Sequence, residues 1–250
     1  MPAAARRLRR RRTASTATPE AAPDWQQAAP GRGRAWGAPT LSCVEITSSD
    51  VETSVGRART LVSGTGDGLL VLGHGAGGGV DAVDLLAARA ATAGLGWRVA
   101  LVEQPWRVRG RKVAEAPTRL DQAWVEVLAA LTGSPLVVGG RSAGARVACR
   151  TAGQVGADAV LCLAFPLHPP GRPGSSRLPE LEAVAVPVLV VQGGRDGFGV
   201  PPGATVIPGA DHGFRVRKGD PPAGPQVEQV VGEWLSGLAR SCRSQPSTRC

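Results

Sequence analysis

The stretch PLVVGGRSAGARVACR, residues 135–150, contains an apolar run, a serine between two glycines, and then a segment of helix-forming residues. Its centre, Gly140 to Gly144, has the spacing G-x-S-x-G. This spacing is typical of a sharp turn from a strand into a helix, with the serine at the strained position. The flanking glycines are needed because side chains there would collide with neighbouring elements. The stretch therefore predicts a nucleophilic Ser142 at the end of a strand.

The surrounding sequence predicts that this strand belongs to a mostly parallel central sheet with helices on both faces. From residue 41 onward, short apolar runs alternate with helical patterns, as in βαβ units. The runs lack the polar alternation of half-exposed strands, so we expect them to be covered on both faces. They are LLVLG from Leu69, WRVALVE from Trp97, PLVVGG from Pro135, AVLCLAF from Ala159 and VPVLVV from Val186.

Helices are predicted where apolar residues recur every three or four positions. One such pattern ends at Gly133, which we expect to cap the helix, and a second lies near the end of the chain. Residues 41–60 are expected to form an early strand or hairpin that joins the sheet. The two helical patterns are Leu120, Trp124, Leu128 and Leu131, and Val227, Val230, Val231, Trp234, Leu235 and Leu238.

Length and charge indicate a single α/β domain over residues 41–240, between a disordered Arg-rich extension (1–40) and a flexible tail (241–250). The 250-residue chain has a formal charge of +9. Eight arginines against Glu20 and Asp24 give residues 1–40 a charge of +6, and the tail adds +2, so 9 − 6 − 2 leaves about +1 for the domain. This distribution disfavours nucleic acid as a partner of the domain.

The cysteines and the hydropathy predict a cytoplasmic protein. Five cysteines, at positions 43, 149, 162, 242 and 250, show no C-x-x-C spacing. An odd, scattered set is typical of reduced thiols, which disfavours a Cys242–Cys250 bond. The basic start lacks the apolar stretch of an export signal, and no run approaches the 18 apolar residues that could span a membrane.

A serine nucleophile needs a base within hydrogen-bonding reach. Three histidines are available. His212 follows the short run ATVI, which is where the base lies when the order along the chain is serine, acid, histidine. His168 comes too early for that order, and His74 belongs to a glycine-rich loop. The sequence therefore favours His212 as the base.

The acid that orients the histidine is expected to lie between Ser142 and His212. Asp196 comes four residues after an apolar strand, where such carboxylates lie. Asp211 is the alternative, but its side chain would normally point away from an adjacent histidine. The resulting order of Ser142, Asp196 and His212 is that of α/β-hydrolases.

The glycine-rich loop, GLLVLGHGAGGGVDAVDLL at 68–86, allows two interpretations. In an α/β-hydrolase it supplies one amide of an oxyanion hole, so we predict the amides of Ala143 and of Ala76 or Gly77 as the two donors, with His74 bracing the loop.

The alternative interpretation of the loop is a dinucleotide fingerprint, Gly73-x-Gly75-x-x-Gly78. Its acid would be Glu103, 30 residues after Gly73. That is farther than the usual spacing of about 20, and this interpretation leaves the serine, aspartate and histidine unexplained.

Five blocks of sequence together resemble a small family of α/β-hydrolases related to dienelactone hydrolases. They are VLGHGAGGG, VGGRSAGARVA, LAFPLHPPGRPG, VVQGGRDGFG and PGADHGF, spread over residues 65–216. The family includes a testis-expressed protein and part of a subunit of the nonspecific-lethal histone-acetylation complex, and the resemblance implies a bacterial member. It also implies Ser142, Asp196 and His212 as the triad, and that some members serve as scaffolds.

The chain departs from the family between the acid and the histidine. Relatives usually have a helix there, whereas 15 residues separate Asp196 and His212 here. Residues 193–204 barely reach the dozen that a parallel crossover needs. Either the helix is replaced by a tight loop or the acid arm is distorted.

These features predict a metal-free, cofactor-free serine hydrolase that cleaves a small-molecule ester or thioester through an acyl-enzyme. The first rival prediction is an inactive domain of the same fold used for binding, and the second is a basic adaptor that binds nucleic acid through residues 1–40. The proline-rich segment 165–180 occupies the position of a lid and is short, which favours an open site. Arg172 and Arg177 are candidates for binding an anionic acyl group, although such arginines are more often solvated. The oligomeric state is left open.

Overall fold

The computed structural model describes residues 45–244, with side chains to residue 240. Eight strands form one sheet in the order β1-β2-β4-β3-β5-β6-β7-β8. The pairs from β4 to β8 are parallel, and β2 pairs antiparallel with both β1 and β4. The strands are β1 (Ile46–Thr53), β2 (Gly56–Gly64), β3 (Gly68–Gly73), β4 (Trp97–Glu103), β5 (Leu136–Arg141), β6 (Ala159–Leu163), β7 (Val188–Gly193) and β8 (Thr205–Ile207).

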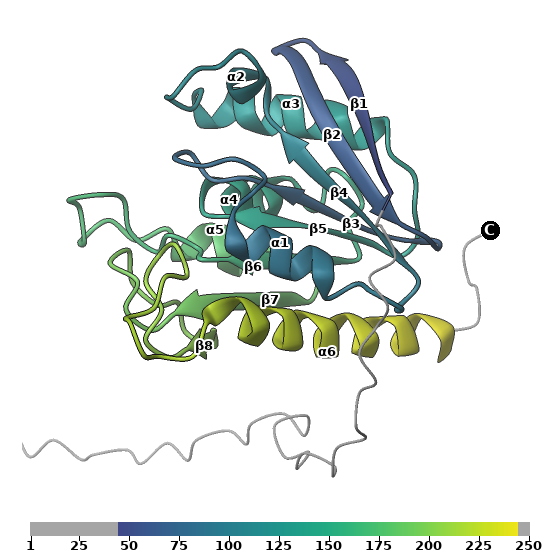
Figure 1. Ribbon diagram of the computed structural model, residues 1–250. Coiled ribbons are helices and arrows are strands. Elements are labelled where there is room, and N and C mark those ends of the chain that lie inside the picture. Colours follow the sequence, from purple (N-terminus) through teal and green to yellow (C-terminus); the bar gives the residue numbers. More distant parts are fainter. Residues whose placement is uncertain (1–44, 245–250) are drawn as a thin grey trace, which may run out of the picture. The chain divides into compact units, whose positions relative to one another are not determined.

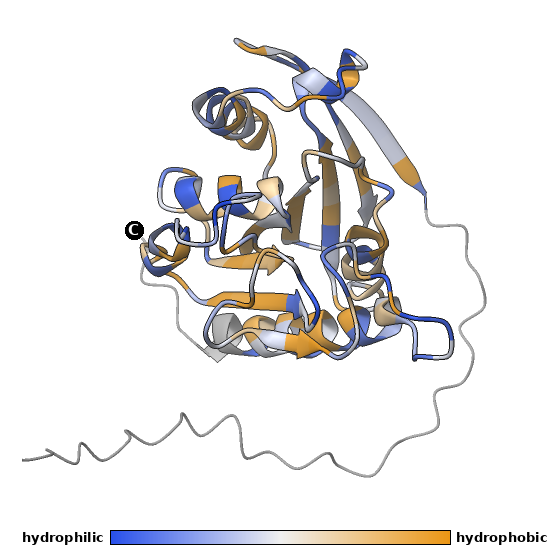
Figure 2. Ribbon diagram, turned by 90° about the vertical axis from the view of Figure 1, so that its left-hand side faces the viewer, coloured by the Kyte–Doolittle hydropathy of each residue, from blue (hydrophilic) through white to orange (hydrophobic). Residues whose placement is uncertain are grey.

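Helices cover both faces of the sheet, as predicted from the apolar strands (Figure 1). On one face lie α1 (Val83–Ala90) and α6 (Ala223–Ser244), which pack against each other. On the other face lie α2 (Pro105–Val108), α3 (Pro117–Ala129), α4 (Ala143–Thr151) and α5 (Leu178–Glu182). Each face has its own apolar cluster, and Figure 2 shows the apolar colour running along the central strands between them.

The sequence prediction for the early hairpin is confirmed, and three tryptophans form part of the core. β1 and β2 form an antiparallel hairpin in which Ile46 pairs with Ser63. The side chains of Trp97, Trp106 and Trp124 are buried in the two apolar clusters. They contribute to the core.

The sequence predicted a helix that ends at Gly133, and this predicted end is wrong. α3 ends at Ala129, so Leu131 lies beyond it and Gly133 does not cap it. Gly133 instead lies against β3: a Cβ there would come within 2.4 Å of the Leu69 Cβ atom and 3.0 Å of the Asp67 carbonyl. The requirement for glycine is therefore a close approach between the α3–β5 connection and the start of β3.

The termini and cysteines are only partly described. Residues 1–44, which include the predicted extension and Cys43, lie outside the described residues, as do 245–250. α6 runs to Ser244, into the predicted tail. Cys149 and Cys162 are buried free thiols with their sulfurs 3.4 Å apart. No helix in residues 45–244 is long and apolar enough to cross a membrane.

Candidate active site

Ser142 lies at the turn between β5 and α4, with φ 54° and ψ −106°. This left-handed φ is strained for a residue with a side chain. The Ser142 amide donates a hydrogen bond to the Leu163 carbonyl of β6 at 2.9 Å, which anchors the turn to the sheet. The predicted strained serine at a strand-to-helix turn is thus present.

The two glycines beside Ser142 permit a close approach of β3. A Cβ on Gly140 would lie 2.3 Å from the Gly73 carbonyl oxygen, and one on Gly144 would lie 2.4 Å from the same atom. Gly140 also has φ 155°. Side chains at either position would push the turn away from β3, so the G-x-S-x-G spacing follows from backbone packing.

The structure brings the three predicted side chains into one hydrogen-bonded chain. The Ser142 Oγ lies 3.0 Å from Nε2 of His212, and Nδ1 of His212 lies 2.7 Å from Oδ2 of Asp196. Because an ionised carboxylate only accepts hydrogen bonds, Nδ1 carries the proton and Nε2 is free to accept from the serine hydroxyl. The ring of Phe198 packs edge-on against the imidazole, with centroids 4.5 Å apart.

Two further donors hold the Asp196 carboxylate, whose side chain is fully buried. The Phe198 amide donates to Oδ1 at 2.8 Å, and Nε2 of Gln192 donates to Oδ2 at 2.7 Å. Gln192 is fully buried in β7 and also lies 3.1 Å from the Phe165 carbonyl and 3.0 Å from that of Gly199. The sequence analysis missed Gln192, although a polar residue at the end of the apolar run VPVLVV is a signal that could have found it.

The short link between acid and histidine is a tight loop. No helix lies between β7 and β8, and the carboxylate nevertheless reaches the imidazole. Asp211, the alternative acid, accepts hydrogen bonds from the amides of Gly213 and Arg215 in its own turn. The geometry therefore favours Asp196 over Asp211 as the partner of His212.

His74 braces the glycine-rich loop, as predicted. Its Nε2 accepts a hydrogen bond from the Gln104 amide at 3.2 Å, so Nδ1 must carry the proton that it donates to the Gly75 carbonyl at 2.9 Å. Burial lowers the pKa of His74 below its usual range, although the Gly75 carbonyl acts in the opposite direction. The neutral ring thus links the loop to the end of β4.

The predicted oxyanion donors come from the residue after Ser142 and from the glycine-rich loop. Ala143 is the first residue of α4, where amides have no acceptor within the helix. A Cβ on Gly75 would lie 3.4 Å from the Ser142 Cβ atom, so the glycine-rich loop runs beside the serine. Ala76 and Gly77 are exposed in the turn that follows.

The dinucleotide interpretation does not fit this loop. Its fingerprint requires the glycines to lead directly into a helix, whereas α1 begins at Val83, five residues after Gly78. Glu103, the proposed ribose-binding acid, lies 3.8 Å from Arg59 of the neighbouring strand.

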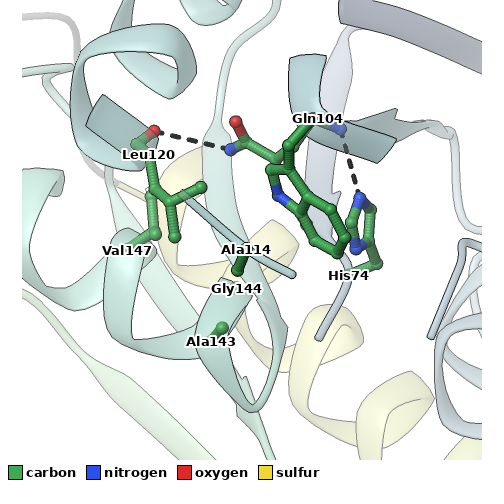
Figure 3. A pocket seen from close by; sticks show the side chains of 9 residues that line it. His74, Gln104, Ala114, Leu120, Ala143, Gly144 and Val147 are labelled. Carbon is green, nitrogen blue, oxygen red and sulfur yellow. Dashed lines mark hydrogen bonds between the residues drawn. The ribbon is translucent and has the colours of Figure 1, made fainter. Parts of the chain in front are cut away.

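A small pocket lies beside the turn that carries Ser142, between the glycine-rich loop and α4 (Figure 3). Its enclosed volume is only about 10 Å³, which is room for about one water-sized group. Gln104 lies at one wall, with its Oε1 buried and without a hydrogen-bond partner among the described residues. The lining residues are Gly73, His74, Gln104, Trp106, Ala114, Leu120, Ala143, Gly144 and Val147.

Residues 165–180, predicted to take the place of a lid, form turns that lead into α5. The backbone amide of His168 donates to the Phe198 carbonyl at 3.0 Å, so the segment is tied to the acid arm. Arg172 is exposed, and the Arg177 guanidinium lies 3.4 Å from the carbonyls of Pro166 and His168. Neither arginine contacts a triad side chain through a described hydrogen bond.

The sheet order, the strained serine and the hydrogen-bonded histidine and aspartate together define an α/β-hydrolase. The chain belongs to the alpha/beta hydrolase domain family, whose model matches residues 66–231. No curated protein matches the chain in sequence.

Several solved structures share the fold at low identity. Est1E from Butyrivibrio proteoclasticus has a TM-score of 0.63 at 13% identity, covering 77% of this chain and 99% of its own. An α/β serine hydrolase without a lid from Xanthomonas campestris has a TM-score of 0.60 at 19% identity, covering 83% and 100%. A dienelactone hydrolase from Anabaena variabilis has a TM-score of 0.58 at 18% identity, covering 78% and 98%.

Proposed function

We propose that this protein is a serine hydrolase that cleaves a small-molecule ester or thioester through an acyl-enzyme. The observation that carries the proposal is the continuous hydrogen-bonded chain from the Ser142 hydroxyl through His212 to Asp196. Such a chain supplies a nucleophile, a base and a group that orients the base.

In the first half of the reaction, the Ser142 Oγ attacks the carbonyl carbon of the substrate while His212 Nε2 takes the hydroxyl proton. Asp196 stabilises the imidazolium that forms and keeps its proton on Nδ1. As the tetrahedral intermediate collapses, the bond from carbonyl carbon to leaving group breaks and His212 gives its proton to the departing oxygen or sulfur. Water then attacks the acyl-enzyme by the same route, which releases the acid and restores the serine.

The amides of Ala143 and of Ala76 or Gly77 are proposed to receive the developing oxyanion. Such donors act mainly on charge that appears in the transition state, and removal of one donor typically costs a factor on the order of 100 to 1,000 in turnover. His74 contributes by bracing the glycine-rich loop through its two buried hydrogen bonds.

The pocket beside the serine turn is proposed to admit no more than the first atoms of a short acyl group. The pocket is small, and Ala143 and Gly144, which follow the serine, form part of its wall. The short segment 165–180 supports an open entrance to the site; the Xanthomonas campestris neighbour is itself described as lacking a lid.

Three further points from the sequence stay predictions. They are the relation to the testis-expressed and nonspecific-lethal proteins, the bacterial origin and a cytoplasmic location.

Labelling by a fluorophosphonate probe tests the proposal. We expect the wild-type protein to be labelled at Ser142, and Ser142→Ala and His212→Ala to lose labelling. His168→Ala is the matched control, since His168 lies outside the triad, and should label like the wild type. A panel of p-nitrophenyl esters from acetate to octanoate should then show a preference for short chains.

The same experiment distinguishes the rival prediction of a binding domain without activity. A folded wild-type protein that the probe does not label would favour that alternative. Equal labelling of all four proteins would show that Ser142 is not the reactive group and would overturn the mechanism.

A further inference from the structure

Two charged residues outside the triad lie next to it, Arg141 partly buried and Asp84 fully buried. Arg141 is the last residue of β5 and immediately precedes Ser142, and Asp84 lies in the first turn of α1. The Arg141 Nε lies 3.2 Å from Oδ2 of Asp84, whose side chain is fully buried. The two groups face each other as an ion pair without an aligned hydrogen bond. Since the desolvation cost of a buried ion pair often exceeds its attraction, stability alone does not account for this one.

The Arg141 guanidinium contacts the backbone of two loops that flank the serine. Its Nη2 donates to the His212 carbonyl at 2.9 Å. Its Nη1 packs against the glycine-rich loop, where a Cβ on Gly75 would lie 3.1 Å away. A planar guanidinium presents donors in fixed directions, so a single side chain can hold several backbone segments in one arrangement.

The loop that carries His212, residues 208–216, is held on the side of the acid by Arg195, which donates from its backbone amide to the Ala210 carbonyl at 2.8 Å and from its guanidinium to the Gly209 carbonyl at 3.0 Å. Its other described backbone hydrogen bonds run mainly within the turn around Asp211, and on the side of the serine the His212 carbonyl accepts from Arg141. The contact from Arg141 therefore ties the backbone of the histidine to the residue next to the serine. It thereby helps to set the distance between Ser142 Oγ and His212 Nε2, which is 3.0 Å and must stay near that value for proton transfer.

We infer that Arg141, held in place by Asp84, is a positioning residue that sets the His212 backbone and the glycine-rich loop around Ser142. The inference rests on the proposed function and extends it to two residues that do not touch the reacting atoms. It implies that loss of the pair slows the chemical step while substrate binding is nearly unchanged. Misplacement of a reacting group by about 1 Å can cost on the order of a hundredfold in rate.

The test must separate positioning from folding, because removal of one partner leaves an unpaired buried charge. The double variant Asp84→Leu/Arg141→Met removes both charges and keeps similar volumes, so we expect it to fold. The matched control is Asp121→Leu/Arg150→Met, which removes a partly buried ion pair between α3 and α4 with an N–O distance of 2.6 Å. That pair has no described contact with the triad.

For the double variant we expect a kcat on an ester substrate at least tenfold below the wild type, a KM within about threefold, and slower fluorophosphonate labelling. The control should keep wild-type values of all three. A double variant with wild-type kcat and labelling rate would overturn the inference. A rise in KM with unchanged kcat would do the same, since it would indicate a role in binding.

A second measurement does not depend on activity. The chain has three histidines, so their ring ¹⁵N and ¹H resonances can be assigned individually by NMR. We expect the His212 ring signals to shift or broaden in the Asp84→Leu/Arg141→Met variant, while those of His168 stay in place. Unchanged His212 signals would overturn the inference. Failure of the wild-type protein to label would instead count against the proposed function, and the NMR result would still decide whether Arg141 positions His212.

Discussion

Asp196 shows how a single carboxylate depends on groups that never contact substrate. Its two oxygens accept hydrogen bonds from His212, from the Phe198 amide and from Gln192. Hydrogen bonds to a charged group are among the stronger ones in proteins. The direction in which the carboxylate faces the imidazole is therefore fixed from two sides, by its own turn and by β7.

Substitution of Gln192 by Met, which keeps the length of the side chain, tests this dependence. We expect kcat/KM on an ester to fall roughly tenfold, since a hydrogen bond to a charged group contributes about 1.5 kcal/mol or more. The free energy of unfolding, measured in urea, should also fall, because the carbonyls of Phe165 and Gly199 lose the second amide hydrogen that they share. Gln229→Met on the exposed face of α6 is the control. An unchanged kcat/KM for Gln192→Met would show that the Phe198 amide suffices.

His74 is expected to make stability depend on pH. Its pKa is lowered in the folded protein, mainly by burial. As the pH falls, the imidazole therefore takes up a proton more readily in the unfolded chain than in the folded protein. The stabilisation from neutral His74 is therefore present above the unfolded pKa of about 6.5 and is lost as the pH falls below it. Urea unfolding at pH 8 and pH 5.5 should show a larger loss for the wild type than for His74→Gln. Equal losses in the two proteins would contradict this account.

At the scale of elements, the contact between β3 and α4 decides where the serine turn lies. Gly144 in the first turn of α4 faces the Gly73 carbonyl, with no room for a Cβ. We expect Gly144→Ala to reduce the free energy of unfolding by about 3 kcal/mol, the upper part of the range for overpacked positions.

Gly153 is the matched control, because it follows the same helix and a Cβ there would meet nothing within 4 Å. We expect Gly153→Ala to be neutral or stabilising by up to about 1 kcal/mol, since alanine has fewer conformations in the unfolded chain. Both free energies come from urea unfolding monitored by tryptophan fluorescence. Similar values for the two alanine variants would show that the turn can move away from β3.

The strands, and the choice of Ser142, Asp196 and His212 as three side chains that meet in one hydrogen-bonded chain, could be predicted from the sequence because they depend on local patterns. Apolar runs located every central strand to within two residues, and the predicted WRVALVE run coincides with β4. The end of α3 could not be predicted in this way, because Gly133 is required by contact with β3, 60 or more residues earlier in the chain. Arg141 and Gln192 were missed for the same reason: their partners come from other elements, and only the folded sheet brings them together.

At the scale of the molecule, the candidate site gathers at the carboxyl ends of the parallel strands. Ser142 follows β5, Asp196 follows β7, His212 follows β8, and the glycine-rich loop follows β3. In open α/β sheets, ligands bind outside these ends of the strands. Because β3 and β5 are neighbours at the centre of the sheet, the loop after one lies against the turn after the other.

A carboxyl group is also buried between α1 and the sheet, and this has a consequence for the stability of the whole domain. Asp84 is fully buried between α1 and the end of β5, and burial raises its pKa to about 6, although the charges of Arg141 and His212 act in the opposite direction. Because the folded protein holds the proton more tightly than the unfolded chain, the contribution of Asp84 to stability is present below about pH 4 and is lost as the pH rises through 6.

A comparison of wild type and Asp84→Asn over pH 4 to 8 measures this contribution. A pKa shift of about two units corresponds to about 3 kcal/mol. We therefore expect the free energy of unfolding of Asp84→Asn, relative to the wild type, to increase by about that amount between pH 4 and pH 8, whatever the cost of the substitution at pH 4. Asp67→Asn, at an exposed position, should keep a constant difference from the wild type. Parallel stability curves for Asp84→Asn and wild type would mean that the buried carboxylate is ionised at no net cost, and that Arg141 compensates fully for its burial.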